Sequence, residues 1–204
     1  MKKLLVVAAI ALVAAAVPAT AIEKGVWVGK IGLHNVDPKS DNGSLAGGAL
    51  DVEVGSSVRP TVMFEYFVAD NLGIEVLAAW PFEHDIDLNG LAAGSTQQLP
   101  PTVSLQYHFN GDAQVSPYAG IGVNYTLFFS EDASGPIAGA DLDLDASLGY
   151  ALHAGVDFKL NDRWWIGVDA RYIDIDTDVK VNGAEVGTVE IDPIAYGVYG
   201  QFRF

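Results

Sequence analysis

The histidines are the side chains of this sequence best suited to acid–base chemistry or to metal binding. There are four, His34, His84, His108 and His153, and no two have the H-x-x-x-H spacing that presents two ligands on one helix face. Ser104 precedes His108 on the same predicted strand, so a serine nucleophile with a histidine base is one interpretation. No G-x-S-x-G turn surrounds this serine. We therefore predict no catalytic residues and no cofactor, and keep an enzyme only as a third hypothesis.

Aspartates at alternate positions form two acidic segments, at 141–145 and 174–185. The second resembles the ligand spacing of an EF-hand calcium loop, but Val179 stands where that loop needs a glycine. We reject an EF-hand and predict no metal-binding residues. Two interpretations of these segments stay open: a solvated acidic face, and oxygen ligands for a divalent cation shared with anionic lipopolysaccharide.

The elements that would position these side chains are strands. From Ser147 to Leu160 apolar residues alternate without a break with small or polar ones. Side chains on a strand point to opposite faces with a period of two, so this segment has one apolar face and one polar face. At roughly 3.3 Å per residue it reaches about 45 Å, enough to cross the apolar band of about 25 Å of an outer membrane at a tilt.

Similar alternation predicts eight strands in the chain. Their expected ranges are 24–36, 57–69, 72–84, 99–110, 115–129, 146–160, 163–178 and 189–204. Short turns at 69–71, 111–114 and 161–162 alternate with long segments rich in Gly, Asp, Ser and Asn at 37–56, 85–98, 130–145 and 179–188. The sequence therefore predicts an all-β fold, an eight-stranded antiparallel transmembrane β-barrel in an up-and-down meander, with long extracellular loops and short periplasmic turns.

The N-terminus has the order of a secretory signal peptide. Lys2 and Lys3 precede an apolar run over 4–17, and Ala19 and Ala21 form an A-x-A cleavage site. We expect residues 1–21 to be removed and residues 22–204 to form a single barrel domain. Because Lys2 and Lys3 are lost, the formal charge changes from −15 to −15 − 2 = −17.

Composition agrees with a membrane barrel in an oxidising compartment. Half of the residues are hydrophobic, yet no run beyond the leader is long enough for a transmembrane helix. The chain has no cysteine, which excludes disulfide and thiolate chemistry. A chain this acidic is a poor nucleic-acid binder. The last strand carries Tyr196, Phe202 and Phe204 on its apolar face and ends on the aromatic, which we interpret as a signal for the barrel insertion machinery.

Several residue strings resemble the OmpW family of small outer-membrane proteins. They are Asp70–Glu75, Pro81–His84, Leu99–Thr102, Pro117–Thr126 and Tyr172–Thr177, and the resemblance covers nearly the whole predicted mature chain. It departs in the loops and at Arg171, where members can carry an aromatic residue. The resemblance implies a barrel in the outer membrane of a Gram-negative cell. It also implies the passage of small hydrophobic molecules across that membrane.

An eight-stranded barrel is narrow and largely filled by side chains. Inward charges of both signs predict a charged plug in the periplasmic half, closed to large solutes. The predicted channel-lining residues are Met63, Phe67, Leu77, Ala79, Phe82 and Arg171.

Prolines are the residues that can open the barrel wall, because proline cannot donate to a strand ladder. Pro60, Pro81, Pro100 and Pro101 lie in or beside three consecutive strands. They predict a lateral gap through which an apolar solute would leave the barrel for the bilayer. The alternative is that these prolines lie above the membrane on exposed edges or bulges.

Two main hypotheses follow. The first is a channel for small hydrophobic solutes, with the lipid bilayer, lipopolysaccharide and the insertion machinery as further partners. The second is a structural or surface-receptor barrel whose loops bind partners. An outer-membrane enzyme is the third.

Overall fold

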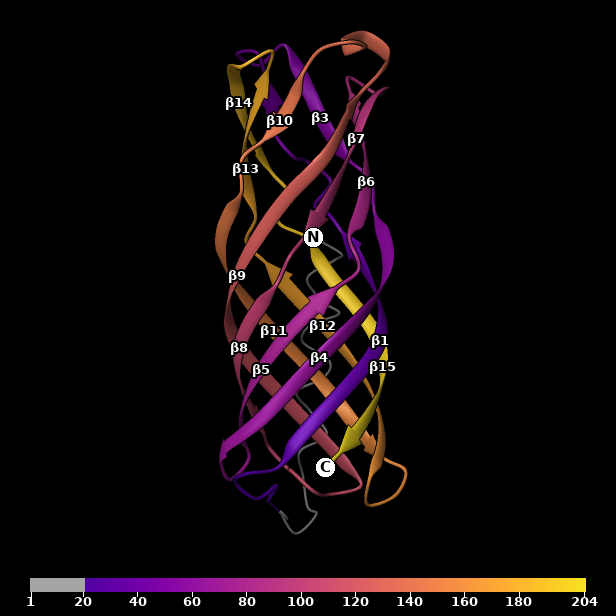
Figure 1. Ribbon diagram of the computed structural model, residues 1–204, viewed down its shortest axis with the longest axis vertical. Coiled ribbons are helices and arrows are strands. Elements are labelled where there is room, and N and C mark those ends of the chain that lie inside the picture. Colours follow the sequence, from indigo (N-terminus) through magenta and orange to yellow (C-terminus); the bar gives the residue numbers. More distant parts are fainter. Residues whose placement is uncertain (1–20) are drawn as a thin grey trace.

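The chain folds into a tall closed β-barrel (Figure 1). This computed structural model describes residues 21–204, so the predicted cleavage residue Ala19 lies outside the described part, whereas Ala21 is exposed at its start. Eight antiparallel strands close the cylinder, each hydrogen-bonded to the next and the last to the first. In ladder order they are β1 (Trp27–Asp37), β4 (Ser57–Ala69), β5 (Leu72–Ala79), β8 (Thr102–His108), β9 (Val115–Ala133), β11 (Ser147–Lys159), β12 (Trp164–Ile173) and β15 (Ile194–Arg203). The predicted fold class is confirmed.

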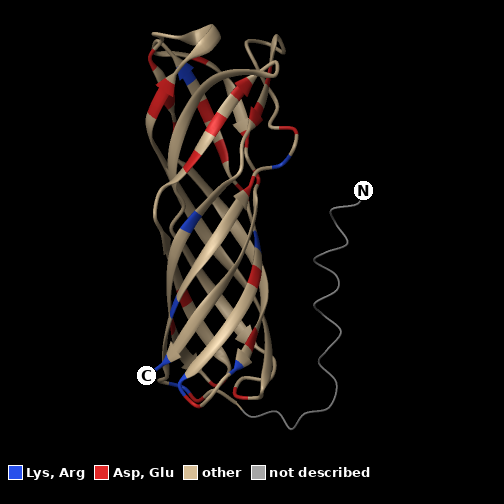
Figure 2. Cartoon of the chain, turned by 90° about the vertical axis from the view of Figure 1, so that its right-hand side faces the viewer, with Lys and Arg blue, Asp and Glu red and all other residues tan. Residues whose placement is uncertain are grey.

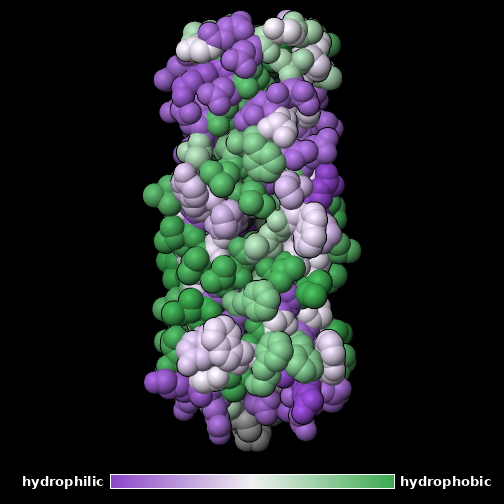
Figure 3. Space-filling view, viewed as in Figure 1, coloured by the Kyte–Doolittle hydropathy of each residue, from purple (hydrophilic) through white to green (hydrophobic). Residues whose placement is uncertain are grey.

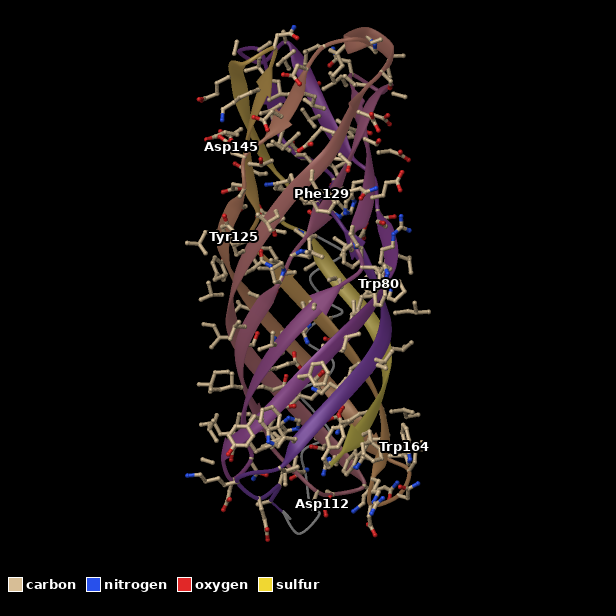
Figure 4. The ribbon with its side chains drawn as sticks, in the orientation of Figure 1. Trp80, Asp112, Tyr125, Phe129, Asp145 and Trp164 are labelled. Atoms are coloured by element: carbon tan, nitrogen blue, oxygen red, sulfur yellow. The ribbon has the colours of Figure 1, made fainter. Side chains whose placement is uncertain are left out.

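Alternation along the strands separates an apolar exterior from a polar interior. In β4, Met63 is 0 % exposed while the adjacent Phe64 is 55 % exposed. The space-filling view shows the result, a broad hydrophobic band between hydrophilic upper and lower ends (Figure 3). Trp164 lies towards the lower edge of the structure, and Trp80 and Tyr125 lie near its mid-height (Figure 4). Amphipathic rings favour the headgroup level, which marks the two boundaries of the membrane. Within residues 21–204, no helix is long and apolar enough to cross a membrane.

The segments expected as long extracellular loops are largely strands. They build an upper tier on the barrel, made of β2 (Ser44–Leu45), β3 (Leu50–Val54), β6 (Phe82–Leu88), β7 (Leu91–Leu99), β10 (Leu142–Leu144), β13 (Asp176–Val181) and β14 (Ala184–Glu190), with a short 3₁₀ turn, η2 (Gly135–Ile137). Strand β9 continues upward to pair with β7, and a hydrogen bond from Ala46 N to Val186 O joins the β2 and β14 sides. These strands were not predicted from the sequence, because register shifts at Ile86/Asp87 and Val179/Lys180 break the two-residue period of apolar residues.

The upper tier stands above the membrane. In β6, Phe82 and His84 are buried, while the intervening Glu83 and the next outward residue, Asp85, are exposed. Asp and Glu residues are frequent along the strands of this tier (Figure 2). Carboxylates on an outward face are not stable against acyl chains, so β6 lies outside the hydrocarbon band.

The C-terminal strand presents the predicted insertion residues to lipid. Tyr196 and Phe204 are exposed on the outer face of the barrel. Phe202 contacts Trp164 with ring centroids 4.9 Å apart and Phe204 with centroids 5.0 Å apart. These rings form an aromatic cluster at the periplasmic boundary.

Candidate functional site

A network of buried charges fills the lower barrel. Glu75 lies at its centre and accepts hydrogen bonds from Lys30 Nζ at 2.6 Å and from Arg171 Nη2 at 2.6 Å. Lys30 also lies 3.1 Å from Glu65, and Arg171 Nε donates to Asp169 at 2.8 Å. All five side chains are buried. Each charge has an opposite charge in contact, which is the condition for keeping ions inside a narrow barrel. We call this network the plug.

Histidines extend the plug on both sides. His34 Nε2 lies 2.7 Å from Asp169 Oδ1, and its Nδ1 lies 2.6 Å from the Thr61 hydroxyl. His108 Nε2 lies 3.0 Å from Glu65 Oε1. His153 Nε2 lies 2.9 Å from the side-chain amide oxygen, Oε1, of Gln106. Three of the four histidines weighed as ligands or bases are therefore structural members of the plug. No group of three metal-ligating side chains occurs within residues 21–204.

Two tyrosines complete the plug because glycines leave room for their rings. Tyr199 donates to Asp157 at 2.6 Å, and its hydroxyl lies 2.7 Å from that of Tyr118. A Cβ added at Gly167 would lie 2.3 Å from the Tyr199 ring, and one at Gly155 would lie 2.4 Å from the Tyr118 ring. Since side-chain carbons are not found that close, each ring requires a glycine opposite it.

The geometry contains one alignment that resembles a catalytic triad. The Ser116 hydroxyl lies 3.5 Å from His108 Nδ1, and His108 Nε2 lies 3.0 Å from Glu65. All three side chains are at most 1 % exposed. The rings of Phe67 and Tyr118 each lie with centroids 5.2 Å from that of His108. A substrate cannot approach this serine without displacing the plug, so the alignment lacks the access that acyl transfer needs.

Above the plug lies a cluster of buried polar side chains that includes Thr102, Asn124 and Thr126, and above this cluster the interior becomes apolar. The upper tier encloses a cavity of about 180 Å³, lined by 17 apolar residues together with His84, Thr96 and Gln98. The apolar lining residues are Leu45, Ala46, Leu50, Val52, Val54, Ile86, Leu88, Ala93, Phe128, Ile137, Leu142, Leu144, Val179, Val181, Val186, Val189 and Ile191. This cavity is built almost entirely from the segments expected to be loops.

The polar groups at the edge of the cavity bind one another or the backbone. His84 Nδ1 lies 2.6 Å from the Gly55 carbonyl oxygen, and its Nε2 lies 3.0 Å from Gln98 Nε2. Donation from Nδ1 to the carbonyl leaves Nε2 as the acceptor for the Gln98 amide. Burial lowers the pKa of His84 below the ordinary histidine value. A neutral imidazole therefore fits the apolar surroundings.

A discontinuity in the barrel wall lies just below the cavity. Strand β5 pairs with β8 up to Leu77 opposite Thr102, and pairing resumes between β6 and β7 at Phe82 opposite Gln98. Between these pairs, residues 78–81 form no ladder pair with residues 99–101, although Ala78 and Ala79 still pair with β4 and Leu99 with β9. We call this discontinuity the seam.

Three of the four predicted gap prolines lie at the seam. Pro81 is on one side of it, and Pro100 and Pro101 are on the other. Pro60 lies one strand away, within β4 opposite Leu33 of β1 and on the lipid face, and its carbonyl accepts a hydrogen bond from Trp80 N. Pro60 therefore contacts the segment on one side of the seam, through Trp80, but does not itself lie across the seam from Pro100 and Pro101.

The predicted channel-lining residues lie inside the barrel but at different heights. Met63 and Leu77 pack with the plug tyrosines, and Arg171 is part of the plug itself. Phe67 packs with residues of the periplasmic end. Only Phe82 and the half-buried Ala79 belong to the apolar layer at the seam, with Val36 and Ala195.

Sequence reasoning missed the residues that line the cavity. Within residues 21–204, none of the six predicted lining residues is among them. The available signal was the short apolar alternation around Val52 and Leu88, which Gly- and Asp-rich composition obscured.

Comparison with known proteins shows the family to which the chain belongs. The family model described as OmpW family matches residues 23–204. The chain belongs to the OmpW family. Outer membrane protein W of Vibrio cholerae is 34 % identical over 200 residues, which cover 92 % of each chain. The crystal structure of the outer membrane protein OprG from Pseudomonas aeruginosa superposes with a TM-score of 0.79 at 32 % identity, covering 89 % of this chain and 97 % of that one.

A third similar protein is named after a metabolic operon. The dibenzothiophene metabolism operon protein PahQ of Pseudomonas aeruginosa is 29 % identical over 169 residues, covering 78 % of this chain and 77 % of PahQ. Membership of the OmpW family and the closed barrel together make this chain an outer-membrane β-barrel protein of a Gram-negative cell, situated in the lipid bilayer.

Proposed function

We propose that this OmpW-family barrel is a channel that passes small hydrophobic molecules from outside the cell into the outer membrane. The observation that carries the proposal is the order of the interior, an apolar cavity in the upper tier and a plug of paired charges below it. An apolar solute gains free energy on leaving water for the cavity. It would lose that gain among the buried ions of the plug.

The size of the cavity indicates the size of the solute. A cavity of about 150 Å³ with apolar walls binds benzene. The cavity of about 180 Å³ therefore suits a single aromatic ring with one or two small substituents, or a short alkyl chain. The operon name of PahQ associates one relative with dibenzothiophene, an apolar aromatic molecule.

Lateral exit is the route that avoids the plug. The seam lies at the level of Phe82, immediately below His84 on the inward face of β6, and His84 lines the cavity. Strands without ladder bonds separate at lower cost than paired strands. We propose that solute leaves the cavity past Phe82 and passes between Pro81 on one side and Pro100 and Pro101 on the other.

The test is uptake of p-xylene by cells that express each variant at equal barrel abundance. Pro100→Val with Pro101→Val restores two backbone donors at the seam, and we expect it to slow uptake. Pro117→Val is the matched control, because it changes a proline in a continuous ladder of the periplasmic half, opposite Val156 of β11, and it should leave uptake unchanged. Unchanged uptake in the double variant would refute the lateral route.

A filled cavity tests the channel itself. Leu88→Trp directs a large side chain into the cavity, and we expect it to abolish uptake while the barrel still folds. Wild-type uptake in this variant would contradict transport through the cavity, whatever the route of exit.

The second candidate is a surface-receptor or structural barrel without transport. The acidic outer face of the upper tier, which includes Glu83 and Asp85, favours it, because such a face attracts cations or cationic partners (Figure 2). Lipopolysaccharide, bridged by divalent cations, is the proposed neighbour of this face. A deletion strain whose p-xylene uptake equals that of the parent would favour this candidate over the channel.

Processing and assembly are the last part of the proposal. We propose that cleavage after Ala21 leaves Ile22 as the first residue of the mature barrel domain. We also propose that Tyr196, Phe202 and Phe204 are read by the insertion machinery. The intact mass of the protein extracted from outer membranes tests the first statement.

A further inference from the structure

We infer that the periplasmic end of the barrel is a binding site for the chain's own mature α-amino group, and that Ile22 closes this end. The inference rests on the proposed cleavage after Ala21. The Ile22 side chain is 3 % exposed and packs against Val28 and Phe67, which fill the bottom of the barrel below the plug. Ala21, in contrast, is exposed. The chain therefore turns from solvent into the barrel at the proposed cleavage site.

Asn71 holds Ile22 by two hydrogen bonds. The Ile22 nitrogen donates to Asn71 Oδ1 at 2.8 Å, and the Asn71 nitrogen donates to the Ile22 carbonyl oxygen at 2.9 Å. Asn71 has φ 61°, a left-handed conformation that asparagine tolerates better than most residues. This conformation belongs to the β4–β5 turn, which places the Asn71 carboxamide at the Ile22 nitrogen.

Gly111 of the β8–β9 turn makes the close approach possible. A Cβ at Gly111 would lie 2.1 Å from Asn71 Oδ1 and 2.5 Å from the Ile22 nitrogen. Any other residue would occupy the position of this hydrogen bond. Two periplasmic turns and the N-terminal segment thus converge on one nitrogen atom.

Further contacts fasten the residues after Ile22 across the same end. Lys24 N donates to Asp70 Oδ1 at 3.0 Å, and Gly25 N donates to the Phe67 carbonyl oxygen at 2.8 Å. Phe67 N donates in turn to the Val26 carbonyl oxygen at 3.0 Å. The position of the Ile22 nitrogen is therefore determined by the barrel rather than by the leader.

Cleavage changes the chemistry of that nitrogen. Hydrolysis adds water across the Ala21–Ile22 peptide bond, so that Ala21 leaves as a carboxylate and Ile22 retains an ammonium. An amide with one donor becomes a cation with three, and a hydrogen bond from a charged donor is stronger than one from a neutral donor. The surface hollow beside Ile22 holds charges of both signs, the carboxylates of Glu23, Asp112 and Asp162 and the guanidinium groups of Arg163 and Arg203, and Asp112 already binds Arg203 and Lys159. The gain therefore comes from the charged donor at Asn71 rather than from a net negative surface. Removal of the leader therefore strengthens the closure of the periplasmic end.

The experiment measures how readily the α-amino group is acetylated. The mature barrel, refolded in lipid vesicles, is treated with a water-soluble acetylating ester at pH 7, and labelling of the N-terminal peptide is followed by mass spectrometry. Asn71→Gly removes the carboxamide and accepts φ 61° without strain, so we expect acetylation about tenfold faster, the equivalent of a hydrogen bond of about 1.4 kcal/mol. Asn71→Asp should slow acetylation, because its carboxylate favours the unreactive ammonium form.

Two controls separate docking from stability. One glycine added before Ile22 moves the amine out of the site, and its acetylation should match that of Asn71→Gly. Asn161→Ala alters another periplasmic turn, where Asn161 accepts from Trp164 N at 3.0 Å, and should leave acetylation of Ile22 unchanged. Equal rates for the wild-type and glycine-extended proteins would overturn the inference. A mature mass that starts elsewhere than Ile22 would also overturn it while leaving the transport proposal intact.

Discussion

Neutralising Glu75 should cost this barrel much of its stability. The carboxylate is 0 % exposed and accepts hydrogen bonds from both Lys30 and Arg171 at 2.6 Å. Each bond to a charged group contributes about 1.5–3 kcal/mol. In Glu75→Gln, Lys30 retains its ion pair with Glu65 and Arg171 retains its ion pair with Asp169, so neither cation is left without a partner. The glutamine carboxamide retains one acceptor oxygen, so one of the two bonds is lost. We expect Glu75→Gln to lower the free energy of unfolding by about 1.5–3 kcal/mol, the contribution of that bond.

The matched control is a pair of the same charge type at the surface. Arg59 Nη2 lies 3.3 Å from Glu83 Oε2, and the two side chains are 36 % and 52 % exposed. Exposed pairs contribute about 0–1 kcal/mol because water and salt screen them. Glu83→Gln should therefore change stability by less than about 1 kcal/mol.

The assay is urea unfolding of each protein refolded in lipid vesicles, followed by tryptophan fluorescence. The chain has four tryptophans, and Trp27, Trp80 and Trp164 are exposed on its outer face, so their emission reports loss of the lipid environment. Equal unfolding midpoints and slopes for Glu75→Gln and the wild type would refute the reasoning, since the plug would then contribute no net stability. Equal losses for Glu75→Gln and Glu83→Gln would refute it as well, because burial would then make no difference.

Three further predictions concern packing, pH and assembly. Gly167→Ala places a Cβ 2.3 Å from the Tyr199 ring and should lower the melting temperature, measured by the heat-induced shift in gel mobility. Gly200→Ala, with no atom within 4 Å of its Cβ, should leave the melting temperature unchanged in that assay. Burial lowers the pKa of His84 in the folded protein, so its stabilising contribution is complete above the pKa of about 6.5 of the unfolded chain and declines as the pH falls. The difference in unfolding free energy between the wild type and His84→Gln should therefore shrink from pH 8 to pH 5. Deletion of Phe204, which is 75 % exposed, should reduce the amount of barrel assembled in outer membranes but not the melting temperature of protein refolded in vitro.

Local patterning was sufficient to predict the membrane-spanning barrel. A strand that crosses lipid must put apolar side chains on one face, and the run from Ser147 to Leu160 does so without a break. The same alternation predicted that Glu65 and Glu75 point into the barrel, and both are buried there in the structure. Membership of the OmpW family was also predicted from short stretches of the sequence, and the family model confirms it.

The upper tier was not predictable from the same pattern. Above the membrane the outward face tolerates acidic residues and glycine, and bulges shift the register. The strands around Val52, Leu88 and Val179 therefore resemble loops in the sequence. Their apolar side chains became a cavity only because distant hairpins close against one another.

The sequence by itself determined which residues face lipid and which face inward, since that depends on a two-residue period within each strand. Only the tertiary structure decided which inward residues meet. Glu75 binds Lys30 and Arg171 from strands 45 and 96 residues away, and Ile22 reaches Asn71 across 49 residues. These partners are set by the stagger of the strands around the closed barrel, a property of the whole cylinder that no single strand encodes.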